Sequence, residues 1–162
     1  MRYVWPAALY EGNFERVIHL LKFERSRAAH IPLAAAMQAA LPYDDWLVVP
    51  LPTASRRMRQ RGYDQAVLLA QAIAKARGLP TRLVLERVQS TRQLGSNRVQ
   101  RQKQSTKMFC MMPRANVQGT KILLVDDVCT TGATLTAAAR LLKQAGAAQI
   151  DAVVAAWQPP KS

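Results

Sequence analysis

The chain contains little cysteine and no long apolar run. Only two of its 162 residues are cysteines, Cys110 and Cys129, and no CxxC pair occurs, so neither a disulfide framework nor a zinc-ligand pattern is indicated. No apolar stretch has the length of a membrane span, and the residues after Met1 lack the apolar segment of a signal peptide. We therefore expect a soluble cytoplasmic protein with reduced thiols and no membrane insertion.

Acidic residues are also scarce. Ten Asp and Glu stand against 23 Lys and Arg, and the resulting formal net charge of +13 predicts an anionic partner. The cations gather in two stretches, one from Arg56 to Arg61 and one from Arg87 to Lys107. For the second stretch, a solvated face that only aids solubility is an alternative interpretation.

The segment from Ile122 to Thr134 carries the clearest functional pattern. Four aliphatic residues predict a strand buried on both faces, and they end in Asp126 and Asp127. Apolar residues at helical spacing predict a helix from Ala133 to Ala145, so the small, hydroxylated residues before it lie at a helix N-terminus, which attracts phosphate. Two carboxylates beside a phosphate site suit the hydroxyls of a ribose 5-phosphate.

Other interpretations of this segment are weaker. The lysine of a P-loop and the G-x-G-x-x-G pattern of a dinucleotide site are both absent. The structural alternative is a buried strand followed by a capped helix, with Asp126 and Asp127 merely solvated. Cys129 lies beside the predicted helix N-terminus, where its thiol pKa could be lowered, although a small buried hydrophobe is the simpler role.

These thirteen positions resemble the signature of the type I phosphoribosyltransferases, which bind 5-phosphoribosyl 1-diphosphate (PRPP) with Mg²⁺. The resemblance implies that Asp126 and Asp127 hold the ribose hydroxyls. It also implies that the metal is held through PRPP, with no protein ligand assigned. The residues implied for the 5-phosphate are Cys129, Thr130, Thr131, Gly132, Ala133 and Thr134. The implied fold is a Rossmann-like α/β domain with a mostly parallel central sheet, flanking helices and a flexible hood.

Three more segments resemble the ComF branch of these proteins, which is associated with DNA uptake for natural transformation. Arg61 to Ala66 resembles its R-G-[FY]-N-Q-A motif, and Tyr10 to Gly12 followed by Leu21 to Phe23 resembles its N-terminal pattern. The residues that resemble its hood are Arg87, Thr91, Gln93 and Arg101. The resemblance implies DNA-uptake helicase or channel proteins as candidate partners.

Three departures from the patterns of these proteins limit what the resemblance implies. Many members begin with a four-cysteine zinc ribbon, which is absent here. Asp64 stands where Asn is usual. Thr130 stands where purine-salvage relatives have an acidic general base, and because threonine is no base at neutral pH, purine salvage by that mechanism is disfavoured.

Strand, loop and helix alternate along the chain, which predicts a parallel sheet covered by helices in one domain over residues 1–162. We expect strands near residues 3–10, 46–49, 81–85, 122–125 and 150–156. We expect helices from Asn13, over residues 27–41, and from Tyr63 to Gly78. We expect residues 1–45 to form an N-terminal helical part of the domain, and the polar residues 86–107 to form a mobile hood loop.

The loop after residues 46–49 predicts the diphosphate site, with Thr53, Arg57 and Arg61 as its ligands and Tyr63 as a neighbouring contact. In the hood, Arg98, Arg101 and Lys103 predict contacts to single-stranded DNA, because one small ligand cannot use all the cations. The function stays open between a PRPP-binding module for DNA uptake and a phosphoribosyltransferase acting on an unidentified base or amine without a DNA role.

Overall fold

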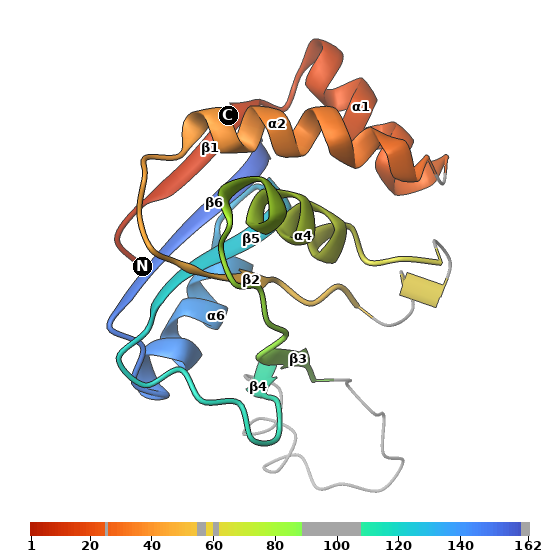
Figure 1. Ribbon diagram of the computed structural model, residues 1–162. Helices are drawn as coiled ribbons and strands as arrows, with labels where there is room; N and C mark the ends of the chain where they lie inside the picture. Colours follow the sequence, from red (N-terminus) through yellow and green to blue (C-terminus); the bar gives the residue numbers. More distant parts are fainter. Residues whose placement is uncertain (25, 55–57, 60–61, 89–107, 160–162) are drawn as a thin grey trace, which may run out of the picture.

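The structure is a computed structural model that describes residues 1–24, 26–54, 58–59, 62–88 and 108–159. Its main sheet is parallel throughout, with strand order β1-β6-β5-β2 (Figure 1). These strands are β1 (Val4–Leu9), β6 (Gln149–Trp157), β5 (Lys121–Cys129) and β2 (Leu47–Pro50). The predicted parallel sheet and its edge strand near residues 3–10 are confirmed.

The middle of the sheet is the most buried part of the molecule. The aliphatic run from Ile122 to Val125 in β5 and the run from Ala152 to Ala156 in β6 are completely buried. Such unbroken apolar runs are expected where helices cover both faces of a parallel sheet, because neither set of side chains then meets water. The two strands therefore form a rigid base for whatever follows their carboxyl ends.

Among the described residues, four α-helices provide that cover. They are α1 (Gly12–Phe23), α2 (His30–Ala40), α4 (Gln65–Arg77) and α6 (Ala133–Gln144), with a short 3-10 turn (Arg27–Ala29) before α2. The first three pack on one face of the sheet and α6 packs on the other (Figure 1), so the core consists of two apolar clusters separated by the sheet. No helix in the described part of the chain is both long and apolar enough to cross a membrane.

The ends of α4 follow from local chemistry. Asp64 precedes the helix and its carboxylate accepts the N–H groups of Ala66 and Val67, which would otherwise lack acceptors. Gly78 ends the helix with φ of +65°, a conformation that glycine adopts without steric cost. The predicted helix from Tyr63 to Gly78 is thus confirmed to within two residues. At α1 the prediction is less accurate, because the residue preceding the helix is Glu11 rather than Asn13.

The prediction of a strand over residues 81–85 is wrong. Thr81 forms only an isolated bridge with Val48. The chain then leaves the main sheet, because Val84 and Leu85 pack into the apolar cluster on the α6 face. There β3 (Leu85–Arg87) pairs in antiparallel fashion with β4 (Phe109–Met111). Arg87 therefore lies in a short strand rather than in a loop, and the rest of the predicted hood, residues 89–107, lies outside the described residues.

Candidate functional site

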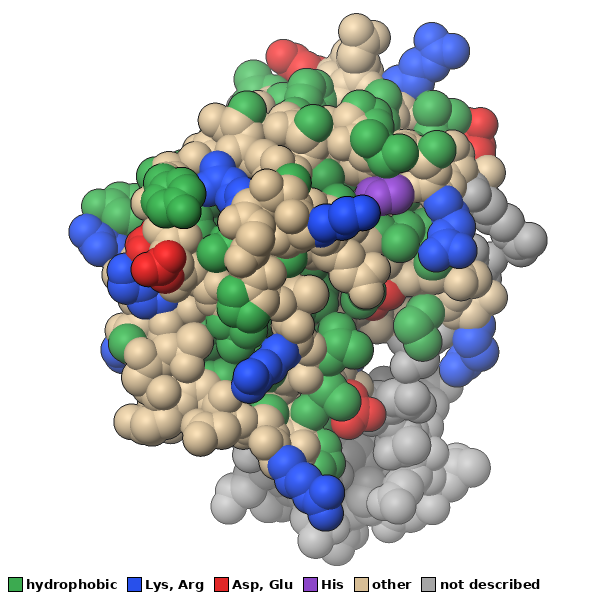
Figure 2. Space-filling view, viewed as in Figure 1, with side chains coloured by type: hydrophobic (Ala, Val, Ile, Leu, Met, Phe, Trp, Pro, Cys, Tyr) green, Lys and Arg blue, Asp and Glu red, His purple; other side chains and the backbone are tan. Residues whose placement is uncertain are grey.

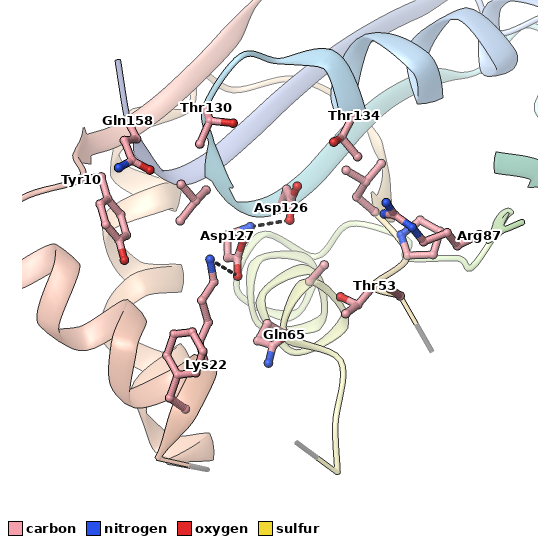
Figure 3. A pocket seen from close by; sticks show the side chains of 16 residues that line it. Tyr10, Lys22, Thr53, Gln65, Arg87, Asp126, Asp127, Thr130, Thr134 and Gln158 are labelled. Atoms are coloured by element: carbon pink, nitrogen blue, oxygen red, sulfur yellow. Dashed lines mark hydrogen bonds and ion pairs between the residues drawn. The ribbon is translucent and has the colours of Figure 1, made fainter. Parts of the chain in front are cut away.

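A pocket of about 670 Å³ opens at the carboxyl ends of the parallel strands β2, β5 and β6. The predicted ribose ligands Asp126 and Asp127 lie at its centre (Figure 3). Thr130 and Thr134 line it on the α6 side, and Thr53 lines it from the loop after β2. Ligands of open α/β sheets bind at this edge, because the loops from neighbouring strands converge there. The fold therefore brings three separately predicted groups of residues to one pocket.

The two acids differ in their surroundings. The Lys22 ammonium from α1 lies 3.0 Å from Oδ2 of Asp127, and both side chains are more than four-fifths buried. Asp126 accepts the backbone N–H of Asp127 at 2.8 Å. Burial, followed by the negative charge of Asp127, raises the pKa of Asp126 well above its ordinary value. Hydroxyl groups that donate hydrogen bonds to these carboxylates would offset the cost of burying them.

The structure divides the predicted 5-phosphate loop between two cavities. Thr130 and Thr134 face the main pocket. Cys129, Thr131 and Gly132 line a smaller cavity of about 270 Å³ beside β1, which Thr130 also borders. Gly132 has φ of +72° where the chain turns into α6, and Ala133 begins that helix. Only part of the predicted loop thus contributes side chains to the main pocket.

The surroundings of Cys129 disfavour a thiolate. Its side chain packs against the apolar cluster on the α6 face. Burial, and then the negative charge of Asp126, raises the pKa of this thiol. The alternative of a pKa lowered by the helix N-terminus is therefore contradicted, because desolvation and a nearby carboxylate outweigh that effect. The simpler role, a small half-buried hydrophobe, agrees with this packing.

The loop after β2 is fixed by Asp64. The Asp64 carboxylate accepts the N–H of Thr53 at 3.0 Å and the Thr53 hydroxyl at 3.1 Å, in addition to capping α4. Arg57 and Arg61, the other predicted diphosphate ligands, lie outside the described residues. The expected ligand contact of Tyr63 is wrong, because this side chain is buried and its hydroxyl donates to the carbonyl of Leu21 at 2.7 Å.

Of the residues predicted for the hood and for DNA, the structure describes one. Arg87 lines the pocket from β3, and its guanidinium lies 5.4 Å from the centre of the Phe109 ring. The others lie outside the described residues: Thr91, Gln93, Arg98, Arg101 and Lys103.

Sequence reasoning assigned no role to four polar residues that line the pocket. These are Tyr10, Lys22, Gln65 and Gln158. Tyr10 and Gln158 are fixed by their backbones, because the N–H of Tyr10 donates to Trp157 and the N–H of Gln158 donates to Cys129, each at 2.8 Å. Tyr10, Lys22 and Gln65 fall within the segments that resemble the ComF branch, and this resemblance could have indicated a role for them in the site. Gln158 directly follows β6 and belongs to no motif, so no sequence pattern indicated its place in the pocket.

Gln65 stands out among these residues. It is 1% exposed, and its amide nitrogen Nε2 has no hydrogen-bond acceptor among the residues that the structure describes. Leaving a buried donor unpaired costs about 1–3 kcal/mol. Such a donor beside a pocket is typical of a group that a ligand satisfies.

The carboxylates of the pocket are candidate contacts for a metal ion that arrives with a larger ligand. No group of three His, Cys, Asp or Glu side chains that could hold a metal occurs among the described residues. The carboxylates of Asp126 and Asp127 lie in the pocket, so they would meet a metal–ligand complex and its hydroxyl groups together. That Mg²⁺ is held through the phosphates of its ligand stays a prediction.

Comparison with known proteins identifies the family. Residues 63–161, more than half of the chain, match the model of the phosphoribosyl transferase domain. The chain is 32% identical over 154 residues to the DNA utilization protein YhgH of Salmonella typhi, covering 88% of this chain and 66% of that protein. It is 33% identical over 109 residues to the competence protein ComFC of Bacillus subtilis, covering 66% of this chain and 42% of that protein. The chain thus spans less than two thirds of the length of these relatives.

Solved structures show the same fold. The allosteric regulatory enzyme of purine biosynthesis superimposes with a TM-score of 0.60 at 21% identity, covering 80% of this chain and 26% of that one. Glutamine PRPP amidotransferase from B. subtilis, complexed with ADP and GMP, superimposes with a TM-score of 0.59 at the same identity. At this identity the likeness shows the fold alone.

The chain therefore belongs to the phosphoribosyl transferase domain family and, within it, to the ComF branch. The fold expected from the sequence resemblance is confirmed.

Proposed function

We propose that this protein binds PRPP with Mg²⁺ in the main pocket. The observation that carries the proposal is the convergence of Asp126, Asp127, Thr130, Thr134 and Thr53 on one pocket at the carboxyl edge of the sheet. In the proposed arrangement the two acids accept hydrogen bonds from the ribose hydroxyls, the threonines before and in α6 hold the 5-phosphate, and the Thr53 loop holds the diphosphate.

Titration calorimetry tests this proposal. PRPP with Mg²⁺ should bind the wild type, and Asp126→Asn/Asp127→Asn should weaken binding by about a hundredfold, because hydrogen bonds to charged acceptors each contribute about 1.5–3 kcal/mol. Asp44→Asn/Asp45→Asn is a matched control, since it also neutralises two adjacent acids, and these precede β2 outside the pocket lining. Equal binding by the wild type and the pocket variant, or no binding by either, would refute the proposal.

We further propose that the protein acts in the cytoplasm in DNA uptake and that it binds single-stranded DNA. Support comes from the relatives named for competence and DNA utilization, and from the net charge of +13. Basic side chains are also more numerous than acidic ones on the face shown in Figure 2. The residues proposed for DNA remain Arg98, Arg101 and Lys103, with DNA-uptake helicase or channel proteins as candidate partners.

The salt dependence of DNA affinity tests this second proposal. A surface that follows phosphates should lose affinity with salt, at a log-log slope of roughly 0.7 per neutralised phosphate. Arg98→Ala/Arg101→Ala/Lys103→Ala should lower that slope. Arg16→Ala/Lys75→Ala/Arg140→Ala removes the same charge from exposed positions on α1, α4 and α6 and should change it less. An equal slope for both triple variants would show that the proposed strip does not contact DNA.

A second candidate is phosphoribosyl transfer to a small base or amine without a DNA role. It is favoured by the hydrogen-bonding groups of Tyr10, Gln65 and Gln158, which line the pocket beyond the residues needed for PRPP. Incubation with PRPP, Mg²⁺ and a panel of bases, amines and DNA distinguishes the candidates. Release of diphosphate with one acceptor only would establish transfer, and no release with any would favour a ligand-binding module.

A further inference from the structure

Helix α2 is apolar on all of its sides. The stretch that contains it, from Ala28 to Tyr43, has no Asp, Glu, Lys or Arg, although 20% of the residues in the chain are charged. Leu33, Ala34 and Met37 bury one side of the helix in the core. A helix that is apolar all round is normally buried on every side. The other side of α2 is nevertheless exposed.

The exposed side of α2 forms a continuous apolar surface. The helix lies between α1 and α4 on one face of the sheet (Figure 1). Its exposed residues, which we call the α2 stripe, are Ala28, Ile31, Pro32, Ala35 and Ala39. Their spacing of three and four residues places them on one side of the helix. Ile31 is 62% exposed, and Tyr43 beyond the end of the helix is 91% exposed. Exposed apolar patches of this kind mark interaction sites.

The absence of charge in the α2 stripe indicates the kind of partner. A nucleic acid would require cations for its phosphates, and the stripe contains none. Another protein surface without charges can cover the stripe, because neither side then loses the hydration of an ion. The stripe itself is such a surface, and a second copy of this chain brings it.

The charges at the two ends of the stripe favour an antiparallel arrangement of two copies. Arg27 directly precedes the stripe and is exposed, with its guanidinium 5.7 Å from the centre of the Tyr63 ring. Asp44 and Asp45 follow Tyr43 at the other end. Asp44 pairs with a lysine, whereas Asp45 is exposed and has no ion pair within the described part of the chain. Antiparallel copies bring each positive end to a negative end, and parallel copies bring like charges together.

The side-chain sizes along the stripe are also complementary in this arrangement. In a two-fold dimer, if one residue contacts a second, the second contacts the first on the other copy. An axis near Ala35 and Ala36 leaves only small side chains at the centre, so the helix axes can approach to the short end of the usual range of about 8–10 Å. Ile31 of each copy then lies opposite Ala39 and Ala40 of the other. Bulky residues thus meet small ones.

We infer that α2 of one copy packs antiparallel against α2 of a second copy and forms a two-fold dimer. The inference goes beyond the proposed function, because no residue of the stripe lines either cavity. At 1.5 Å per residue the stripe is only about 20 Å long, so the interface is smaller than the usual area of about 800 Å² per partner. We therefore expect a weak dimer with a Kd of about 10–100 µM.

Analytical ultracentrifugation from about 1 µM to 1 mM tests the dimer. Ala35→Glu should weaken it at least about tenfold, because two carboxylates then meet at the axis. Thr136→Glu adds the same charge at an exposed position of α6, on the opposite face of the sheet, and should leave the Kd within about twofold. Both variants should keep the unfolding temperature of the wild type. A wild type that stays monomeric throughout, or equal Kd values for Ala35→Glu and Thr136→Glu, would overturn the inference.

Charge exchange tests the antiparallel arrangement. Arg27→Glu and Asp45→Arg should each weaken the dimer by about threefold or more, because each places like charges at both ends of the interface. Net charge alone would shift the two variants in opposite directions. Arg27→Glu/Asp45→Arg should return the Kd to within about twofold of the wild type, which also excludes a folding defect. A double variant that dimerises no better than the single variants would contradict the arrangement.

Salt provides a further test. Two chains of net charge +13 repel each other, and salt screens this repulsion, whereas the exposed ion pairs at the ends of the stripe contribute little. Dimerisation should therefore tighten as salt rises from about 50 to 300 mM, in the opposite sense to binding of DNA. A dimer that weakens over this range would be held by surface charges rather than by the α2 stripe, and would overturn the inference.

Discussion

The two ends of the main pocket are assembled by different routes. We call the end lined by Thr53, Thr134 and Arg87 the phosphate end, and the end lined by Tyr10 and Gln158 the amide end. At the phosphate end, Thr53 follows directly after β2 and is held by Asp64 of the same strand–loop–helix unit. At the amide end, Tyr10 and Gln158 come from opposite ends of the chain and meet only because β1 lies beside β6. Short local segments thus build the proposed PRPP site, whereas the sheet order builds the proposed acceptor site. The residues of the proposed acceptor site can therefore change without altering those of the proposed PRPP site.

Removing the Asp64 carboxylate should affect the phosphate end most. In Asp64→Ala, Thr53 loses both acceptors that hold its loop and α4 loses its cap. We expect about tenfold weaker PRPP binding and a loss of about 1–2 kcal/mol in the free energy of unfolding. Calorimetry and urea unfolding measure these two effects. Asp64→Asn keeps one oxygen as acceptor and should lose less of both, and a larger loss for Asn than for Ala would show that the cap and the loop are not coupled through this carboxylate.

Lys22 is the corresponding test for the amide end. In Lys22→Met, Asp127 remains largely buried without its cation, which should lower the free energy of unfolding by about 1–2 kcal/mol. The affinity for PRPP should fall several-fold, because an uncompensated carboxylate repels an anion. Urea unfolding of Lys22→Met/Asp127→Asn should recover most of the lost stability. If the two substitutions are additive instead, the ion pair does not contribute in this way.

Asp126 lies between the two ends and gives a pH-dependent effect. Its pKa in the folded protein is raised above the ordinary value of 3.8, so the folded state holds this proton more tightly than the unfolded chain. The contribution of Asp126 to stability is therefore present below the ordinary value and is lost as the pH rises through the folded pKa. Asp126→Asn should gain stability relative to the wild type near pH 7.5 and lose that advantage in acid. Urea unfolding across this range measures the difference, and a constant difference would contradict the raised pKa.

Arg77 lies outside both ends and should leave ligand binding unchanged. Its guanidinium donates to the carbonyls of Gln38, Leu41 and Pro42, and so joins α4 to the end of α2. Arg77→Met should lower the free energy of unfolding by about 1–2 kcal/mol. The affinity for PRPP should stay within about twofold in calorimetry. A larger change in affinity would show that the pocket depends on overall stability rather than on its own residues.

The parts of the site that the sequence reveals are those encoded by neighbouring residues. The segment from Ile122 to Thr134 contains a strand, two acids and a helix start, so local patterns suffice to place Asp126 and Asp127 beside a phosphate loop. Periodicity also identified most helices and the parallel sheet. The prediction of a strand at residues 81–85 was wrong, because the contacts of Val84 and Leu85 with the core decide where the chain leaves the sheet.

Other features could not be predicted because they depend on tertiary contacts. The pairing of Lys22 with Asp127 requires α1 to pack beside the end of β5. The position of Tyr63 beside arginines in the sequence suggested a ligand contact, yet its hydroxyl donates a hydrogen bond to the carbonyl of Leu21 and fixes the end of α1. The raised thiol pKa of Cys129 reflects desolvation and Asp126, neither of which is visible from the helix start alone.

The neighbouring positions of β1 and β6 also constrain the order of assembly during synthesis. Strand β1 pairs with β6 along Val4 to Leu9, so the first strand finds its neighbour only when residues 149–157 have left the ribosome. Contacts across such long stretches of chain form slowly. Residues 4–9 must therefore wait as an unpaired apolar segment while almost all of the domain is translated. The amide end is completed last, and a nascent chain stalled before Gln149 would expose this strand to chaperones or to aggregation.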